Sequence, residues 1–150
     1  MKKFIETFNL QFRNLHNRSI EFVGKIPPDK LFWQPFETHF QFPVNSFGAN
    51  ILRSAGKVEQ TFNGIATRLW DDPFEWTLPE QLSTNELIIE YLNEVETAGL
   101  KAFTLFHTDE DLLREFPAPI KMRSILELLL ETLTAAENFQ GRAIAVYNFL

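Results

Sequence analysis

The sequence predicts an all-α protein, a four-helix bundle with long, aromatic-rich crossover connections, in one domain covering residues 1–150. Two observations favour this fold. Four long segments repeat apolar residues at three- and four-residue steps, the spacing of one helical face, and none alternates as a strand does. The chain is also 45% hydrophobic and 23% charged, which is typical of one globular domain. Four amphipathic helices bury their apolar faces by packing against one another.

The first helix is expected from about Phe4 to Ile26, where apolar residues recur at helical spacing. Pro27 and Pro28 end it, because proline disfavours a helical residue before it and cannot donate a backbone hydrogen bond.

The first connection, residues 28–45, carries three prolines and many aromatic residues. It is too apolar for a floppy linker, so we expect an ordered segment over one end of the bundle, with Leu31, Trp33 and Phe36 tucked in. A strand over 40–44 is the alternative. This connection of roughly 19 residues exceeds the about 2–8 residues of simple bundles, which favours up-down-down-up order with a crossover.

The second helix is expected from about Phe47 to Leu69, with Ser46 as its N-cap. A second aromatic, proline-bearing connection follows over 70–82.

A third helix follows, running to about residue 106. Ser83 and Glu86 form a capping box at its start. The acidic run at 108–111 is typical of the cap of a short extra turn.

The fourth helix is expected within residues 121–150, with Phe139 on its inward face. Ser124 can cap its start, and Glu127 can close a capping box. Gly141 sits late in the helix, where it either weakens the helix or lets a neighbour approach closely.

The formal net charge of −6 and the lack of a basic stripe argue against nonspecific binding to nucleic acid or to an anionic membrane. Zero cysteines exclude disulfides, zinc thiolate sites and a cysteine nucleophile. No stretch approaches the roughly 18 apolar residues of a membrane span, and the polar N-terminal residues do not resemble a signal peptide. We therefore expect a cytoplasmic protein with no nucleic-acid or membrane partner.

The three histidines, His16, His39 and His107, fall on different elements. A metal site in a helix bundle usually needs ligands on facing helices, often as an i, i+3 or i, i+4 pair. Each histidine is therefore expected to be structural, with His16 at the edge of the core. The acidic clusters at 71–75 and 109–111 are expected to be caps or solvated faces.

Charged residues close to the inward faces are the strongest chemical candidates. They are Arg53 and Lys57 on the second helix, and Glu137 and Arg142 on the fourth. The favoured interpretation is an ion pair between helices, and a binding or catalytic role is the alternative. No glycine-rich phosphate loop or nucleophile-elbow pattern accompanies them.

Three motifs follow one another along the chain: IPPDKLFWQP at 26–35, SFGA at 46–49 and NFQGRAIAVY at 138–147. Their order and spacing resemble the first-helix exit, the second-helix start and the C-terminal ending of DinB/YfiT-like proteins. The resemblance spans almost the whole chain and implies a DinB/YfiT-like bundle, commonly a homodimer. Many members hold a divalent metal through one histidine on the second helix and two on the fourth. Some are thiol transferases for low-molecular-weight thiols such as bacillithiol or mycothiol.

Carried over to this sequence, those ligand positions fall on Arg53, or on Ser54 if the register slips by one, and on Ala135 and Phe139. None of these side chains can replace a neutral imidazole. Alanine and phenylalanine offer no donor atom, and arginine is a permanent cation. We therefore expect no metal and no cofactor.

In place of the metal, we expect Phe139 to fill the space and Arg53 to pair with Glu137 or Glu131. The candidate pocket residues lie along the second and fourth helices. They are Arg53, Ser54, Lys57, Glu131, Ala135, Glu137, Asn138, Phe139 and Arg142.

The first functional hypothesis is a DinB-like protein of unassigned activity that binds a small molecule or acts as an interaction module, with a pocket at a dimer interface. The alternative is a divergent thiol transferase or hydrolase using the same pocket. There Arg53 would orient an anionic substrate, and Glu137 or Glu59 would be the base. A third hypothesis is a structural partner protein, which would present an exposed apolar patch and no ligand cavity.

Overall fold

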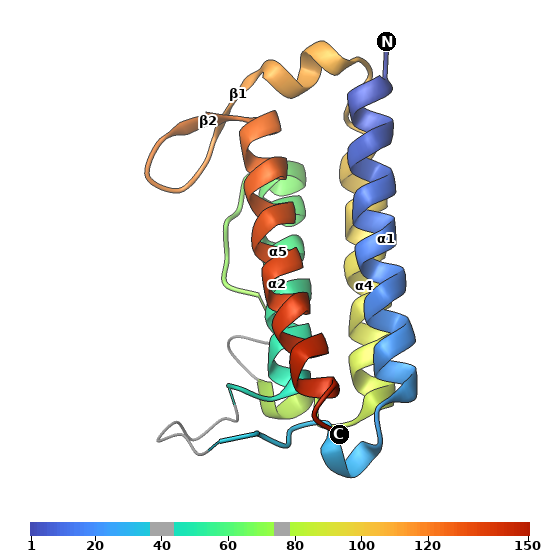
Figure 1. Cartoon of the computed structure of the whole chain (residues 1–150). Helices are drawn as coiled ribbons and strands as arrows, with labels where there is room; N and C mark the ends of the chain where they lie inside the picture. The colour runs from blue at the N-terminus through green and yellow to red at the C-terminus, as the bar shows by residue number, and fades with distance from the viewer. Residues whose placement is uncertain (37–43, 74–78) are drawn as a thin grey trace.

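The fold is a bundle of four long helices with one small β-hairpin, as a computed structural model describes it for residues 1–36, 44–73 and 79–150 (Figure 1). The long helices are α1 (Lys3–Lys25), α2 (Phe47–Thr67), α4 (Asn85–Phe103) and α5 (Ile125–Tyr147). The short elements are the 3-10 helices η1 (Pro28–Lys30), η2 (Pro79–Gln81) and η3 (Asp109–Leu113), and the strands β1 (Glu115–Pro117) and β2 (Met122–Ser124). The predicted all-α class with four helices is confirmed.

The helices follow the expected up-down-down-up order. α2 and α4 run parallel, and α1 and α5 run the opposite way (Figure 1). α2 packs against α5 and α4, and α1 packs mainly against α4 and α5. The order is as expected, but the first connection, whose length favoured it, joins helix ends at the same end of the bundle. The crossover lies between α2 and α4 (Figure 1).

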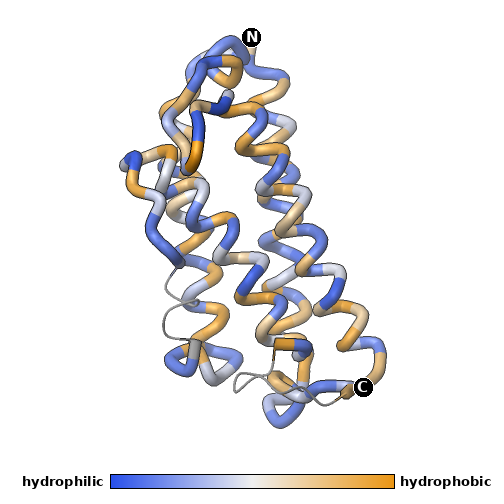
Figure 2. Tube along the Cα trace, turned by 90° about the vertical axis from the view of Figure 1, so that its left-hand side faces the viewer, coloured by the Kyte–Doolittle hydropathy of each residue, from blue (hydrophilic) through white to orange (hydrophobic). Residues whose placement is uncertain are grey.

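Aromatic rings fill the layer between α1, α2 and α4. The rings of Phe12 and Phe62 meet edge to face with centroids 5.0 Å apart, and those of Phe62 and Phe103 lie 5.4 Å apart. Apolar residues recur along every helix between hydrophilic ones (Figure 2). Such ring pairs add geometric preference to the area they bury.

Both ends of α1 are held by side chains from distant parts of the sequence. The Asp109 carboxylate accepts hydrogen bonds from the backbone N–H groups of Phe4 and Ile5, both at 3.1 Å. The Asn85 amide donates to the carbonyls of Val23 and Ile26, both at 3.0 Å. These groups satisfy backbone donors and acceptors that a helix leaves unpaired at its ends.

The N-terminal caps follow the sequence with one exception. Ser46 accepts from the N–H of Ala49 and Ser124 from that of Glu127, each at 3.1 Å, as expected. The expected Ser83 cap is wrong, because α4 begins one residue later and Thr84 accepts from Leu87 N–H at 3.2 Å.

The expected capping box at the start of α5 does not close, whereas the expected cap at η3 forms. The Glu127 carboxylate bonds Arg123 at 3.2 Å and does not turn back to Ser124. At the short extra turn, the Asp111 carboxylate accepts from His107 N–H at 2.7 Å and from Thr108 N–H at 3.1 Å. Those two hydrogen bonds lower the pKa of Asp111, and the expected cap there is confirmed.

The hairpin corrects the expectation of a chain without strands. β1 and β2 pair antiparallel, with Phe116 opposite Arg123. Three-residue strands are too short for alternation to reveal, and the prolines at 117 and 119 are typical of a connection. The possible strand over 40–44 falls almost wholly outside the described residues.

Two expected burials are also wrong. Phe36 is 61% exposed, whereas Leu31, from the same connection, is buried as expected. Leu69, which the helical spacing of the second helix also places on its inward face, is likewise 61% exposed, because α2 ends at Thr67 and Arg68 adopts a left-handed conformation with φ of 63°. The chain then folds back over the helix.

Within the described residues, no helix combines the length and the apolar character needed to cross a membrane.

Candidate functional site

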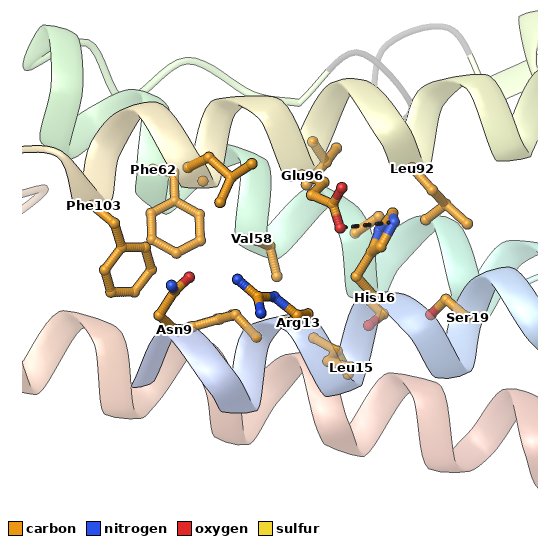
Figure 3. A pocket seen from close by; sticks show the side chains of 16 residues that line it. Asn9, Arg13, Leu15, His16, Ser19, Val58, Phe62, Leu92, Glu96 and Phe103 are labelled. Carbon is orange, nitrogen blue, oxygen red and sulfur yellow. Dashed lines mark ion pairs between the residues drawn. The ribbon is translucent and has the colours of Figure 1, made fainter. Parts of the chain in front are cut away.

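A cavity of about 230 Å³ lies between α1, α2 and α4 (Figure 3). Its lining is mostly apolar. The apolar lining residues are Phe12, Leu15, Ala55, Val58, Phe62, Leu92, Val95, Gly99, Leu100 and Phe103. The lining residues on α1 extend from Asn9 to Ser19, ten positions or about 15 Å along the helix axis, so the cavity is elongated.

Aromatic rings form one end of the cavity, where Phe12, Phe62 and Phe103 meet. Gly99 of α4 faces the same rings. A Cβ atom at position 99 would lie 3.4 Å from the ring of Phe62, in ordinary contact. Because position 99 has no side chain, the Phe62 ring packs close to the backbone of α4, and Gly99 lines the cavity beside it.

His16 and Glu96 join α1 to α4 along the polar side of the cavity. The His16 Nε2 atom lies 3.1 Å from a Glu96 carboxylate oxygen, and the two side chains are 14% and 39% exposed. Burial lowers the pKa of His16 below its usual 6.5, against the opposing effects of Glu96 and of the hydrogen bond with Asn93. The imidazole is therefore neutral at neutral pH and donates to Glu96.

Arg13 lies one turn before His16 on the same face of α1. Its side chain extends from α1 toward the space beside Val58 (Figure 3). Among residues 1–36, 44–73 and 79–150, no hydrogen bond or ion pair engages the Arg13 guanidinium. An arginine stays charged at any physiological pH, so Arg13, whose side chain is exposed to solvent, brings an unpaired positive charge to the exposed part of the lining.

Two serines line the far end of the cavity. Ser54 of α2 donates to the Ala136 carbonyl of α5 at 2.8 Å. Ser19 of α1 accepts from the Gln140 amide at 2.8 Å. Both are nearly fully buried, and both point back toward α5 as well as lining the cavity.

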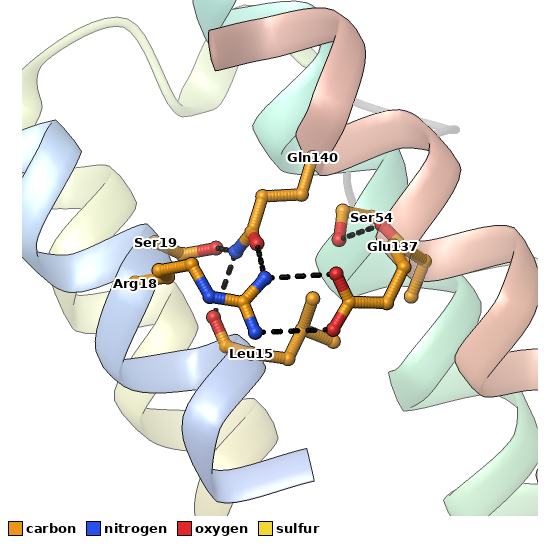
Figure 4. Close-up of polar contacts among 7 residues, drawn as sticks. Leu15, Arg18, Ser19, Ser54, Glu137 and Gln140 are labelled. Atoms are coloured by element: carbon orange, nitrogen blue, oxygen red, sulfur yellow. Dashed lines mark hydrogen bonds and ion pairs between the residues drawn. The ribbon is translucent and has the colours of Figure 1, made fainter. Parts of the chain in front are cut away.

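Behind Ser19 a polar network ties α1 to α5 (Figure 4). The buried Gln140 amide also donates to the Leu15 carbonyl at 2.8 Å and accepts from Arg18 at 2.6 Å. Arg18 forms a forked pair with Glu137, at 2.8 and 3.2 Å. Every member has a partner, so the network is a structural clamp.

The predicted pairing of Arg53 is wrong. Glu137 pairs with Arg18 of α1, and Glu131 pairs with Arg123 near the start of α5. The hydrogen bond from Arg123 lowers the pKa of Glu131, with a smaller contribution from the charge of Lys57. Sequence periodicity places charges on a helix face, but it does not say which neighbouring helix supplies the partner.

The remaining candidates on α5 lie apart from the cavity lining. Phe139 is only half-buried, and the inward position goes to Gln140, which is 1% exposed. The guanidinium of Arg142 lies 5.4 Å from the centre of the Phe139 ring. Asn138 is exposed and Ala135 is half-buried. Of the nine residues predicted for the pocket, Ser54 lines this cavity and the other eight do not.

Within the described residues, no group of three or more His, Asp or Glu side chains is arranged so that it could hold a metal ion. His16 lies at the cavity as part of its pair with Glu96, His107 is exposed, and His39 lies outside the described residues. Glu59, the other predicted base, accepts a hydrogen bond from the Tyr91 hydroxyl.

Arg13, Glu96 and Gly99 are functional candidates that sequence reasoning missed. A signal was present on α1, where Asn9, Arg13 and His16 interrupt the apolar face at three- and four-residue steps. Nothing in the sequence indicated that α4 would face them with Glu96 and a glycine.

No family model, no curated protein and no solved structure matches this chain. Its function is therefore inferred from the cavity and its side chains.

Proposed function

We propose that this protein binds a small, largely apolar molecule in the cavity between α1, α2 and α4. The observation that carries the proposal is the volume of about 230 Å³ behind an apolar lining. An apolar cavity of about 150 Å³ is enough to hold benzene. The space here therefore suits a ring with a few further atoms, or a short branched chain.

The mixed lining supports a binding site over a packing defect. Ligand sites combine mostly apolar walls with a few polar groups that orient the ligand. Here Asn9, Arg13 and His16 supply such groups from α1, and Glu96 supplies one from α4. Arg13 and Glu96 lie where the cavity meets the surface, so they can contact the polar end of a ligand whose apolar part is inside.

Filling the cavity from Gly99 tests the proposal. We expect Gly99→Leu to fold and to lose binding, because Gly99 lines the cavity and the leucine side chain would occupy part of its volume. The measurement is a thermal-shift screen with a panel of small aromatic and aliphatic fragments, followed by calorimetric titration of those that stabilise the wild type.

Gly141→Leu is the matched control. Gly141 is also a helical glycine, but an added Cβ there meets open space. It should therefore keep the ligand affinity of the wild type. Equal fragment binding by the Gly99→Leu and wild-type proteins, both with native circular dichroism, would contradict the proposal.

We further propose that the scaffold is DinB-like, cytoplasmic and homodimeric. The helix number, the up-down-down-up order and the three motifs along the chain support the kinship. Zero cysteines support the location. Sedimentation equilibrium tests the dimer, and a mass equal to one chain at all concentrations would count against it.

A transferase or hydrolase activity in the same cavity is the alternative proposal. The observation that favours it is the neutral His16, oriented by Glu96 beside an apolar space, since a neutral imidazole can accept a proton. Glu137 is less suited as a base because Arg18 holds it in a forked pair. Turnover of a small thiol with an electrophile, lost in His16→Gln and kept in His107→Gln, would favour the enzyme.

A further inference from the structure

We propose that the ligand of this cavity is a small monocarboxylic acid, with its aryl or short alkyl body against the aromatic end and its carboxylate at Arg13. This inference rests on the proposed binding function and names the chemical class that the site selects.

The apolar end favours a ring. Phe12, Phe62 and Phe103 form a cluster of edge-to-face and tilted rings, which can extend to a further ring in the same geometry. Gly99 lets the Phe62 ring pack close to α4 at this end of the cavity. A ligand ring in the cavity would pack against this cluster.

The charge at Arg13 selects the head group. Arg18 pairs with Glu137 across α1 and α5, and Arg123 pairs with Glu131 near the start of α5. Arg13 has no such partner among the described residues. A planar guanidinium fork matches a carboxylate, and it lies adjacent in sequence to Phe12 of the aromatic end.

The surrounding charges favour a ligand with one negative charge over a dianion. Glu96 is the other charged group in the lining, and the neutral His16 does not cancel its charge at neutral pH. No charged side chain of α2 lines the cavity. The charges of Arg13 and Glu96 sum to zero, so a monocarboxylate paired with Arg13 adds one negative charge to the site, whereas a dianion such as a phosphate monoester adds two and meets stronger repulsion from Glu96 and from the net charge of −6.

The probes are phenylacetate and its neutral amide, phenylacetamide, which share shape and differ in charge. Calorimetric titration at neutral pH and low salt should show phenylacetate binding the wild type at least tenfold more tightly than the amide. Arg13→Gln should erase this preference by weakening the acid at least tenfold while leaving the amide within about twofold. Glu96→Gln should change the affinity for the acid in the opposite direction, making it tighter.

Two controls separate the site from general charge effects. Arg142→Gln removes the same charge from an exposed position on α5 and should leave both affinities unchanged. Gly99→Leu should abolish binding of both probes. Circular dichroism and urea unfolding establish that each variant is folded.

The possible outcomes decide between the two proposals. If the amide binds as tightly as the acid, or if Arg13→Gln leaves the preference intact, the carboxylic-acid inference is overturned and the binding function stands. If neither probe binds, this inference is also overturned, and the binding function then depends on the fragment panel tested with Gly99→Leu.

Discussion

Gln140 joins α5 to α1 through buried hydrogen bonds that the local sequence pattern does not predict. Its side chain is 1% exposed, donates to Leu15 and Ser19, and accepts from Arg18. A buried amide is stable only when its donors and acceptors find partners, and here all the partners come from α1. Gln140 therefore helps to fix how α1 and α5 pack against each other, together with the Arg18–Glu137 pair.

Gln140→Ala should lower the free energy of unfolding by about 3 kcal/mol, because it leaves a void and strips buried partners of their hydrogen bonds. Urea unfolding followed by circular dichroism measures the change. Asn138→Ala, at an exposed position of the same helix, is the control and should stay within about 0.5 kcal/mol of wild type. A loss for Gln140→Ala no larger than that of the control would contradict the role of the clamp.

His16 should make stability depend on pH. Burial holds its folded-state pKa below the 6.5 of the unfolded chain, so between those two values the unfolded chain binds more protons. Stability should therefore fall as the pH drops through this window, and the stabilisation is fully present above it. Urea unfolding at about pH 7.5 and about pH 5.5 measures the difference, which should be smaller in His16→Gln.

His107→Gln, at an exposed position after α4, is the control for that comparison and should keep the pH dependence of the wild type. An NMR titration of the His16 ring gives the pKa directly. A value above that of a model histidine would contradict the expectation.

At the scale of elements, α2 and α5 use their glycines in opposite ways. A Cβ at Gly64 would lie 2.5 Å from the ring of Trp70, which folds back over the end of α2. A Cβ at Gly141 would meet nothing within 4 Å. The close approach of the Trp70 ring requires a glycine at position 64. Gly141 only weakens its helix, so the alternative that a neighbour approaches Gly141 closely is wrong.

Gly141→Ala should therefore raise the free energy of unfolding by roughly 0.5–1 kcal/mol, the difference in helix propensity. Gly64→Ala should lower it, because the Trp70 ring must move and loses the hydrogen bond from its indole N–H to the Pro117 carbonyl. Urea unfolding of the two variants side by side is the measurement. Stabilisation by both substitutions would show that the Trp70 packing matters little.

The ends of α1 show why elements can be predicted better than their partners. Periodicity and the Pro27–Pro28 pair place this helix to within a residue or two. The groups that cap it, Asp109 and Asn85, lie 105 and 62 residues from their partners. Local sequence contains no information about contacts of that separation.

At the scale of the whole molecule, the cavity arises from the way three helices meet. Arg13 and His16 of α1 line the cavity, as do Glu96 and Gly99 of α4. α2 contributes small residues such as Ser54 and Ala55 to the lining. The candidates chosen from α2 and α5 lie mostly on other faces, because one face of a helix can meet any of several neighbours in a bundle.

Four amphipathic helices and the serines that begin α2 and α5 could be predicted from local sequence, because periodicity and capping act over a few residues. The pairing of charges, the side chain of α5 that faces inward and the place of the cavity emerged from the folded structure alone. Those outcomes depend on the rotation of each helix against its neighbours, which is set by the packing of residues far apart in the chain.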